Sequence, residues 1–293
     1  MVEYLAGNRI RGTSTERTAL GVIGVTLADS DISKTELKTY LKFNETSPDN
    51  IVNQATTVGS THSLGSAADL VVTGAQYEQT GMTGFGDALL FDGLNDYAIE
   101  NTSDKGTHKF LWTSNCKWSL AFWAKFPTVG EQTLWYNVDG SPQAGLDTVM
   151  NSSNGFNVDI RGTNSWIYSN AFNGMTGLST NTWYHIVITY DQTLGSANGK
   201  IYIDGVKEDE KNKTSDSNST SDAEYNLNYF RTPSNAHHMN IIVQEWSEWN
   251  RVLTDAEISS LYRGAPNVQD GAVFYETDNN KSYVLYDGSW SEL

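Results

Sequence analysis

Short runs of alternating apolar and polar residues recur roughly every 8 to 15 residues along most of this chain. In "LKTYLKFN" the side chains of Leu37, Leu41 and Phe43 share one face, and "KWSLAFWAKF" follows the same period of two. "NTWYHIVITYD" and "GKIYIDGVKED" are the strongest strand patterns, and Asp204-Gly205 forms a tight turn within the second. This spacing predicts an all-β sandwich.

One segment breaks the strand pattern and predicts a short helix at about 255–262. In "TDAEISSLYRG", Thr254 is placed to cap the helix, Glu257 completes a capping box and Gly264 ends it. We therefore expect three zones: an arm at 1–35, a sandwich at 36–265 and a tail at 266–293. In the tail, "AVFYET" and "SYVLYD" flank Asp278-Asn279-Asn280, which predicts a β-hairpin.

The composition limits the classes of partner that this chain is expected to bind. The net charge of −16 and a pI near 4.6 argue against nucleic acid or an anionic membrane surface. One cysteine, Cys116, excludes an intramolecular disulfide, and the longest apolar runs are too short for membrane insertion. "TALGVIGVTLA" is interrupted by Gly21 and Gly24, so we interpret it as a strand or packing segment and not as a signal sequence.

The stretch "ALLFDGLNDYAIE" at 88–100 places two apolar runs around an acidic turn. Asp and Asn side chains bond their own backbone in such turns, and glycine adopts positive φ without strain. The pattern therefore predicts a strand, a tight turn and a second strand. Asp92 and Asp96 are either turn residues or one wall of a metal site, and the sequence leaves both interpretations open.

Read in order, several of these segments resemble the laminin G-like domains of the concanavalin A-like lectin superfamily. The matching segments are "YLKFNE", "GFGDALLFDGLNDY", "KWSLAFWAKF", "TWYHIVITYD", "GKIYIDGV" and "VQEWSEWNRVLTDAEISSLY", which together cover about residues 38–264. The resemblance implies a jelly-roll sandwich of two antiparallel sheets. It also implies structural calcium, for which the corresponding residues are Asp92, Asp96, Gln244 and Glu245. Gln244 stands where relatives often carry Asp, and its carbonyl oxygen is a weaker substitute.

Glycoside hydrolases occur in the same superfamily, so two acids on one face of a strand would be candidates for catalysis. Retaining hydrolysis needs two carboxyl groups about 5 Å apart, which on one strand means a spacing of two or four. Glu245 and Glu248 are three apart and should lie on opposite faces. Glu208 and Glu210 have the right spacing but lack aromatic surroundings. We therefore expect no enzymatic activity.

Aromatic side chains are the candidates for glycan binding, because a sugar ring packs on a flat aromatic face. Trp246 and Trp249 are three residues apart, which predicts that at least one faces outward. Most aromatic residues of a sandwich fill its core, so core packing is the alternative for each candidate. The candidate ligand residues are Trp135, Tyr136, Trp166, Tyr168 and Trp249.

The two ends resemble those of virion proteins. "GAVFYETDNNKSYVLYDGSW" resembles terminal hairpins of phage and marine virus tail-fibre proteins, and "EYLAGNRIRGTSTERTALG" resembles openings of viral structural proteins. These resemblances imply a non-catalytic adhesion protein at a virion or cell surface, with host glycans and other virion or surface proteins as partners. The alternatives are a secreted or surface carbohydrate-binding module of a marine microbe and a divergent glycoside hydrolase. The apolar stretches "GVIGVTLA" and "AVFYE" predict packing of the ends in a homo-oligomer.

Overall fold

The chain divides into two compact units, a larger one of Lys34–Leu253 and a smaller one of Met1–Ser33 with Thr254–Leu293. The smaller unit is thus built from both ends of the chain. The computed structural model describes residues 3–5, 9–14, 17, 26–30, 32–46, 50–82, 85–138, 144–151, 155–162, 166–172, 178–215, 219–234, 236–263, 271–286 and 289–293. The segment 18–25 and Gly264 lie outside this range.

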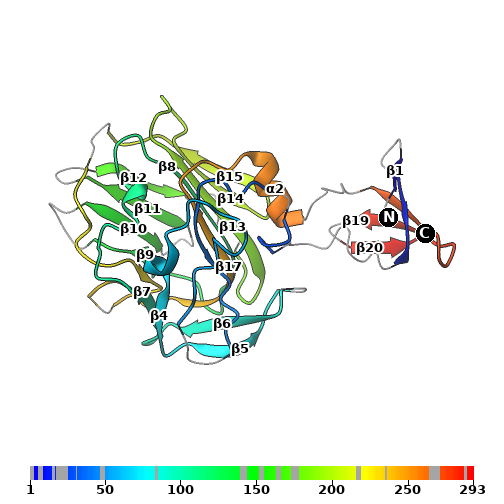
Figure 1. Ribbon diagram of the computed structural model, residues 1–293, viewed down its shortest axis with the longest axis horizontal. Coiled ribbons are helices and arrows are strands. Elements are labelled where there is room, and N and C mark those ends of the chain that lie inside the picture. The colour runs from blue at the N-terminus through cyan, green and yellow to red at the C-terminus, as the bar shows by residue number, and fades with distance from the viewer. Residues whose placement is uncertain are drawn as a thin grey trace. The chain divides into compact units, whose positions relative to one another are not determined.

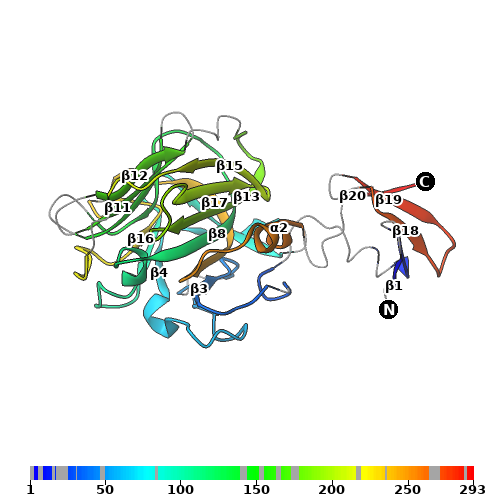
Figure 2. The same ribbon diagram turned by 90° about the horizontal axis from the view of Figure 1, so that it is seen from above.

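The larger unit is a sandwich of two antiparallel sheets, as predicted (Figure 1 and Figure 2). The seven-stranded sheet has the order β12 (Trp166–Phe172), β11 (Phe156–Arg161), β10 (Gly145–Met150), β9 (Gln132–Tyr136), β16 (Asn228–Tyr229), β7 (Tyr97–Glu100) and β4 (Leu70–Thr73). The eight-stranded sheet has the order β15 (Val206–Lys211), β14 (Gly199–Ile203), β13 (Trp183–Asp191), β8 (Lys117–Lys125), β17 (Asn240–Trp249), β6 (Asp87–Asp92) and β5 (Gln76–Thr80), with β3 (Leu37–Leu41) also paired to β17. Two 3₁₀ turns, η1 (Gly65–Ala68) and η2 (Lys109–Leu111), lie in the connections.

Strand β17 is the centre of the eight-stranded sheet. It pairs with β8 along one edge, while β6 and then β3 share the other edge. The change of partner falls at Glu245, whose φ of 54° is unusual for a residue with a side chain. Every residue of β17 after Asn240 is buried, so both of its faces are covered.

Aromatic side chains fill the space between the two sheets. Trp246 stacks on Phe122 with ring centroids 4.8 Å apart, and Trp135 meets Trp246 edge-on at 5.9 Å. Such offset and edge-on pairs add to the stabilisation that comes from buried apolar area. The core therefore uses residues from facing strands that are far apart in the sequence.

Both predicted turns are present. Asp204 and Gly205 have φ of 51° and 77°, the left-handed conformations of a two-residue hairpin turn. In the turn after β6, Leu94 N donates to Asp92 Oδ1 at 2.8 Å and Asp92 N donates to Asp96 Oδ2 at 3.0 Å. Asp92 and Asp96 thus bond the backbone of their own turn.

The smaller unit holds a five-stranded sheet, in the order β1 (Glu3–Leu5), β2 (Arg9–Gly12), β18 (Val273–Glu276), β19 (Ser282–Tyr286) and β20 (Ser289–Glu292). Strands β18 and β19 form the predicted hairpin. Strand β2 from the arm pairs in parallel with β18 from the tail, and β20 adds a strand that the hairpin prediction did not include.

The predicted helix is α2 (Asp255–Arg263), and its first turn has the predicted capping box. Glu257 N donates to Thr254 Oγ1 at 3.2 Å, and Thr254 N donates to Glu257 Oε2 at 2.9 Å. These reciprocal bonds satisfy two backbone donors that a helix N-terminus otherwise leaves without partners. No helix in the described ranges is long and apolar enough to cross a membrane.

Candidate functional site

The outer face of the seven-stranded sheet carries a row of polar side chains that crosses several strands. Along β10 and β11, Leu146, Phe156, Val158 and Ile160 belong to the core, so the alternating positions point the other way. Residues that pair across neighbouring strands point to the same face of the sheet, so the strand register places one outward-facing residue of each strand beside the next. The row is Asn228, Tyr136, Asp147, Asp159 and Ser169, and we call it the outer row.

Two carboxyl groups stand directly opposite each other in the outer row. Asp147 on β10 pairs with Asp159 on β11, an arrangement that repels and so destabilises a sheet by itself. Arg161 offsets part of this repulsion, with its Nη2 atom 3.5 Å from Asp147 Oδ2. Burial raises the pKa of Asp159, although Ser169 and Arg161 act in the opposite sense. Two neighbouring acids thus have different environments.

The other end of the row is fixed by an arginine. Arg231 Nε donates to Asn228 Oδ1 at 3.1 Å, and its guanidinium lies 3.2 Å from the centroid of the Tyr97 ring. Asn228 also donates through Nδ2 to the carbonyl oxygen of Asn226 at 2.8 Å. Asn228 and Asp147 are buried, whereas Tyr136 and Asp159 are half-buried and Ser169 is exposed. Asn228 and Asp147 are therefore buried at the base of the row, whereas Tyr136, Asp159 and Ser169 are accessible to solvent.

Of the predicted aromatic ligand residues, Tyr136 lies in this row. Trp135, Tyr168 and Trp249 have 1%, 1% and 0% exposure, so their prediction as ligand platforms is corrected: they are core residues. The reason is the period of two, because Trp135 must point inward when Tyr136 points outward. The side chain of Trp166 lies outside the described residues.

The expectation that Trp246 or Trp249 faces outward is also wrong. Both rings are fully buried. Opposite faces of a strand differ in exposure only when one face meets solvent, and β17 is covered on both.

The four residues predicted to hold calcium fall into two pairs. Asp92 lies opposite Asn240, whereas Gln244 is four positions further along β17, or about 14 Å at the usual rise per residue. Gln244 Oε1 accepts from Met82 N at 2.7 Å, and Tyr40 donates its hydroxyl to Glu245. Within the described residues, no three His, Cys, Asp or Glu side chains form a group suited to a metal ion. Calcium stays a prediction.

Asp96 has a structural role in its turn. Its side chain occupies the space beside Gly74, where an added Cβ would lie 1.9 Å from Asp96 Oδ1. Only glycine therefore fits at position 74, whose φ is +84°. Burial raises the pKa of Asp96.

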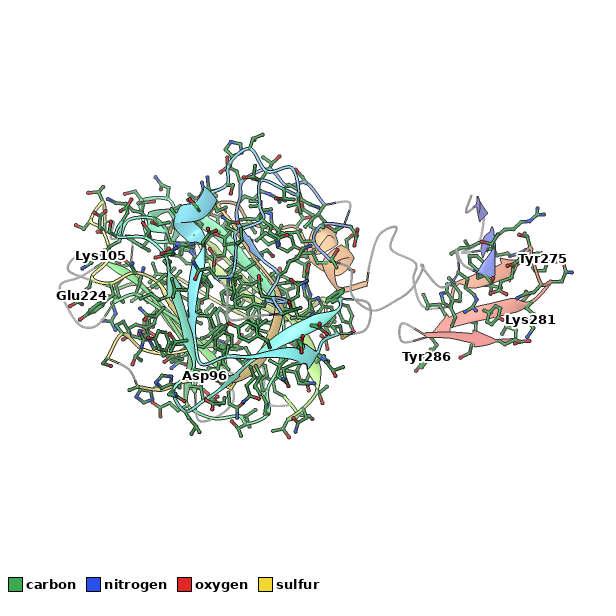
Figure 3. All side chains as sticks on the ribbon, turned by 60° about the horizontal axis from the view of Figure 1, so that its bottom comes forward. Asp96, Lys105, Glu224, Tyr275, Lys281 and Tyr286 are labelled. Carbon is green, nitrogen blue, oxygen red and sulfur yellow. The ribbon has the colours of Figure 1, made fainter. Side chains whose placement is uncertain are left out.

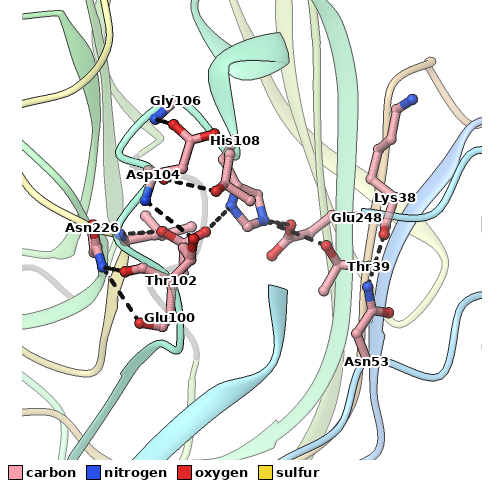
Figure 4. A network of polar contacts seen from close by, with 12 residues as sticks. Lys38, Thr39, Asn53, Glu100, Thr102, Asp104, Gly106, His108, Asn226 and Glu248 are labelled. Atoms are coloured by element: carbon pink, nitrogen blue, oxygen red, sulfur yellow. Dashed lines mark hydrogen bonds and ion pairs between the residues drawn. The ribbon is translucent and has the colours of Figure 1, made fainter. Parts of the chain in front are cut away.

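A buried histidine between two glutamates is a feature that the sequence did not reveal. His108 meets Glu100 through Nδ1 and Glu248 through Nε2, the latter at 2.7 Å from Glu248 Oε2 (Figure 4). All three are buried, with 1%, 5% and 0% exposure. Glu100 is on β7, His108 precedes η2 and Glu248 is on β17, so this triad joins both sheets.

Electrostatics keep His108 and Glu248 charged. Burial alone would lower the pKa of His108, but the carboxylates of Glu248 and Glu100 raise it to about 10. Burial would raise the pKa of Glu248, yet the His108 ring holds it below its usual value. Glu248 Oε1 also accepts from Trp246 Nε1 at 2.6 Å and from the Tyr229 hydroxyl at 3.1 Å. Replacing one residue of the triad by a neutral one would leave a buried charge without its partner.

His185 has the opposite environment. It is buried on β13, and its ring centroid lies 5.1 Å from that of Trp123. Burial lowers the pKa of His185 to about 3, so the ring is neutral near pH 7.

Sequence comparison identifies a family. A family model described as the concanavalin A-like lectin/glucanases superfamily matches residues 96–259, more than half of the 293-residue chain. No curated protein matches the chain at a significant level.

Solved structures share the fold at low sequence identity. The chain is similar to the binding domain of botulinum neurotoxin serotype D (TM-score 0.54, 16% identity, covering 80% of this chain and 52% of that one). It is similar to Trypanosoma rangeli sialidase in complex with sialic acid (TM-score 0.52, 15% identity, covering 77% of this chain and 32% of that one). It is also similar to domain 4 of a GH43 extracellular arabinanase from Geobacillus stearothermophilus in complex with arabinotriose (TM-score 0.51, 15% identity, covering 78% of this chain and 98% of that one). The chain spans only about a third of the sialidases' length.

Proposed function

Because the chain belongs to the concanavalin A-like lectin/glucanases superfamily, we propose that it is a non-catalytic adhesion protein whose sandwich binds glycans. The observation that carries this proposal is the outer row, in which Tyr136 lies between Asn228 and Asp147. Two structural neighbours, one bound to sialic acid and one to arabinotriose, support a carbohydrate ligand for this fold.

The chemistry of the row fits neutral sugars. Carboxylates accept hydrogen bonds from neighbouring hydroxyl groups, and a half-buried tyrosine ring offers an apolar surface to a pyranose face. The facing acids Asp147 and Asp159 repel a carboxylate on a ligand, as does the net charge of −16. We therefore propose neutral glycans, not sialylated ones, as the ligands.

The test is a glycan array, followed by titration calorimetry with the best ligand. Asp159→Asn removes one acceptor charge with little change of shape and should weaken binding about tenfold, or about 1.4 kcal/mol. Glu210→Gln is the matched control, because Glu210 is exposed on β15 of the other sheet. Equal affinity of Asp159→Asn and wild type, or binding confined to sialylated glycans, would contradict the proposal.

Hydrolysis is a second candidate, favoured by the facing pair of Asp147 and Asp159. Retaining hydrolysis needs two carboxyl groups about 5 Å apart, one with a raised pKa. The two acids lie on different strands, β10 and β11, so the spacing of acids along a single strand does not reveal them as a pair. We expect no release of reducing sugar from laminarin or agarose. Release that Asp147→Asn and Asp159→Asn both abolish would establish an enzyme.

The location and assembly proposals rest on the chain ends. We propose a virion or cell-surface protein that forms a homo-oligomer, supported by the resemblance of both ends to viral structural proteins. The described strands of the arm pair with the tail of the same chain, so an oligomer needs contacts beyond this sheet. Light scattering at micromolar concentration should give a multiple of the 32.4 kDa chain mass. A monomeric mass would refute assembly.

A further inference from the structure

Strand β16 is short for its position in the sandwich. It consists of Asn228 and Tyr229 alone, yet it joins β9 to β7 in the middle of the seven-stranded sheet. Phe230 follows at once with a φ of 68°, which ends the strand. Two residues provide few ladder hydrogen bonds, so this strand needs other contacts to stay in register.

The buried triad supplies contacts on both sides of β16. Leu227 N, immediately before the strand, donates to Glu100 Oε2 at 2.7 Å. The Tyr229 hydroxyl donates to Glu248 Oε1 at 3.1 Å. His108 holds the two glutamates in place, since each of its ring nitrogens meets one of them (Figure 4). The two ends of β16 are thus bonded to one charged unit.

The residue that β16 presents outward is Asn228, which belongs to the outer row. Asn228 lies opposite both Tyr136 and Ile99, and it receives the hydrogen bond from Arg231. Displacement of β16 would therefore move Asn228 and release the arginine that lies over Tyr97.

We infer that the Glu100–His108–Glu248 triad positions β16 and, through Asn228, the glycan-binding face. This inference rests on the proposed function for its second half, whereas the first half concerns the chain alone. His108 and the glutamates are positioning residues, because they are buried and act through the strand between them and the outer face.

Hydrogen exchange tests the first half. Glu248→Gln replaces the ion pair between Glu248 and His108 by a neutral hydrogen bond at most, because an amide carries no charge and only a deprotonated ring nitrogen of His108 can accept from its NH₂ group. Tyr229→Phe removes the hydroxyl alone and provides a milder variant if Glu248→Gln does not fold. Tyr168→Phe removes a buried hydroxyl from β12 of the same sheet and is the control.

We expect exchange at residues 227–230 to rise at least tenfold in both Glu248→Gln and Tyr229→Phe, with less than threefold change in β8 and β13. A uniform rise throughout the sandwich, or no rise at 227–230, would overturn the inference. In the same variants the affinity for the glycan bound by wild type should fall at least fivefold, and unchanged affinity would refute the positioning role. If wild type binds no glycan, the proposed function fails, while exchange still decides whether the triad holds β16.

Discussion

The two units of the chain achieve order by different means. The sandwich buries a large aromatic core that includes Trp112, Trp118, Trp135 and Trp246. In the smaller unit, the core of the five-stranded sheet is Ile10, Ala272, Phe274 and Leu285, with Trp290 packed against them. A core this small contributes little hydrophobic stabilisation relative to the entropy of ordering the chain. The difference indicates that polar contacts contribute a larger share of the stability of the smaller unit than of the sandwich.

Those polar contacts join the arm to the tail. Arg17 Nε pairs with the fully buried Glu276, and its guanidinium lies 3.7 Å from the centroid of the Tyr283 ring. Ser14 N and Oγ both donate to the carboxylate of Asp278. Because these contacts connect residues more than 250 positions apart, the smaller unit can complete its fold only when both ends are present.

The largest effect is expected from Trp246→Ala in the sandwich core. Loss of a buried tryptophan costs about 3–5 kcal/mol, and here it also removes a donor from Glu248. Trp290→Ala is the counterpart in the smaller unit, where the ring packs on Phe274. Denaturant titration followed by hydrogen exchange should show each variant destabilising its own unit. Loss of protection in both units from either change would mean that they unfold together.

A smaller effect, confined to the smaller unit, is expected from Arg17→Met. It leaves the carboxylate of Glu276 buried without its cation, at a cost of about 3 kcal/mol. Lys281→Met is the matched control, since Lys281 and Glu292 form an exposed pair and such pairs contribute little to stability. Exchange of the β18 and β19 amides distinguishes the two. Equal effects of the two variants would show that the Arg17 contact is not special.

The pH dependence should also differ between the units, because all five histidines of the sequence lie in the sandwich. The raised pKa of His108 stabilises the fold fully below pH 6.5, and this contribution is lost as the pH rises toward about 10. His185 acts oppositely: its lowered pKa means that stability is lost as the pH falls from 6.5 toward about 3. The sandwich should be most stable near pH 6–7 by these two groups. A midpoint that rises steadily from pH 5 to pH 9 would contradict this.

The smallest effect is expected from calcium. All four residues implied by the family resemblance lie in the sandwich, so millimolar calcium should raise the melting temperature of that unit relative to EDTA. The smaller unit should not respond. Identical melting temperatures of the sandwich in calcium and in EDTA would contradict the prediction that it binds calcium.

Local patterns in the sequence predicted the fold well. The Asp204-Gly205 turn, the tail hairpin and the capping box at Thr254 depend on neighbouring residues and were confirmed. Features that depend on register were not predictable. Asp147 and Asp159 become neighbours only once β10 and β11 are aligned, and His108 meets Glu248 across 140 positions of sequence. The burial of Trp249 likewise follows from what covers β17 and not from its spacing.

We propose that the sandwich binds glycans through its outer row. The direct test compares Tyr136→Ala with Tyr286→Ala in the full chain, since Tyr286 is a 74% exposed tyrosine of the smaller unit (Figure 3). Calorimetry with the best neutral glycan from the array should show at least tenfold weaker binding for Tyr136→Ala and wild-type affinity for Tyr286→Ala. Unchanged binding by a folded Tyr136→Ala protein, or loss of binding in Tyr286→Ala, would contradict the account.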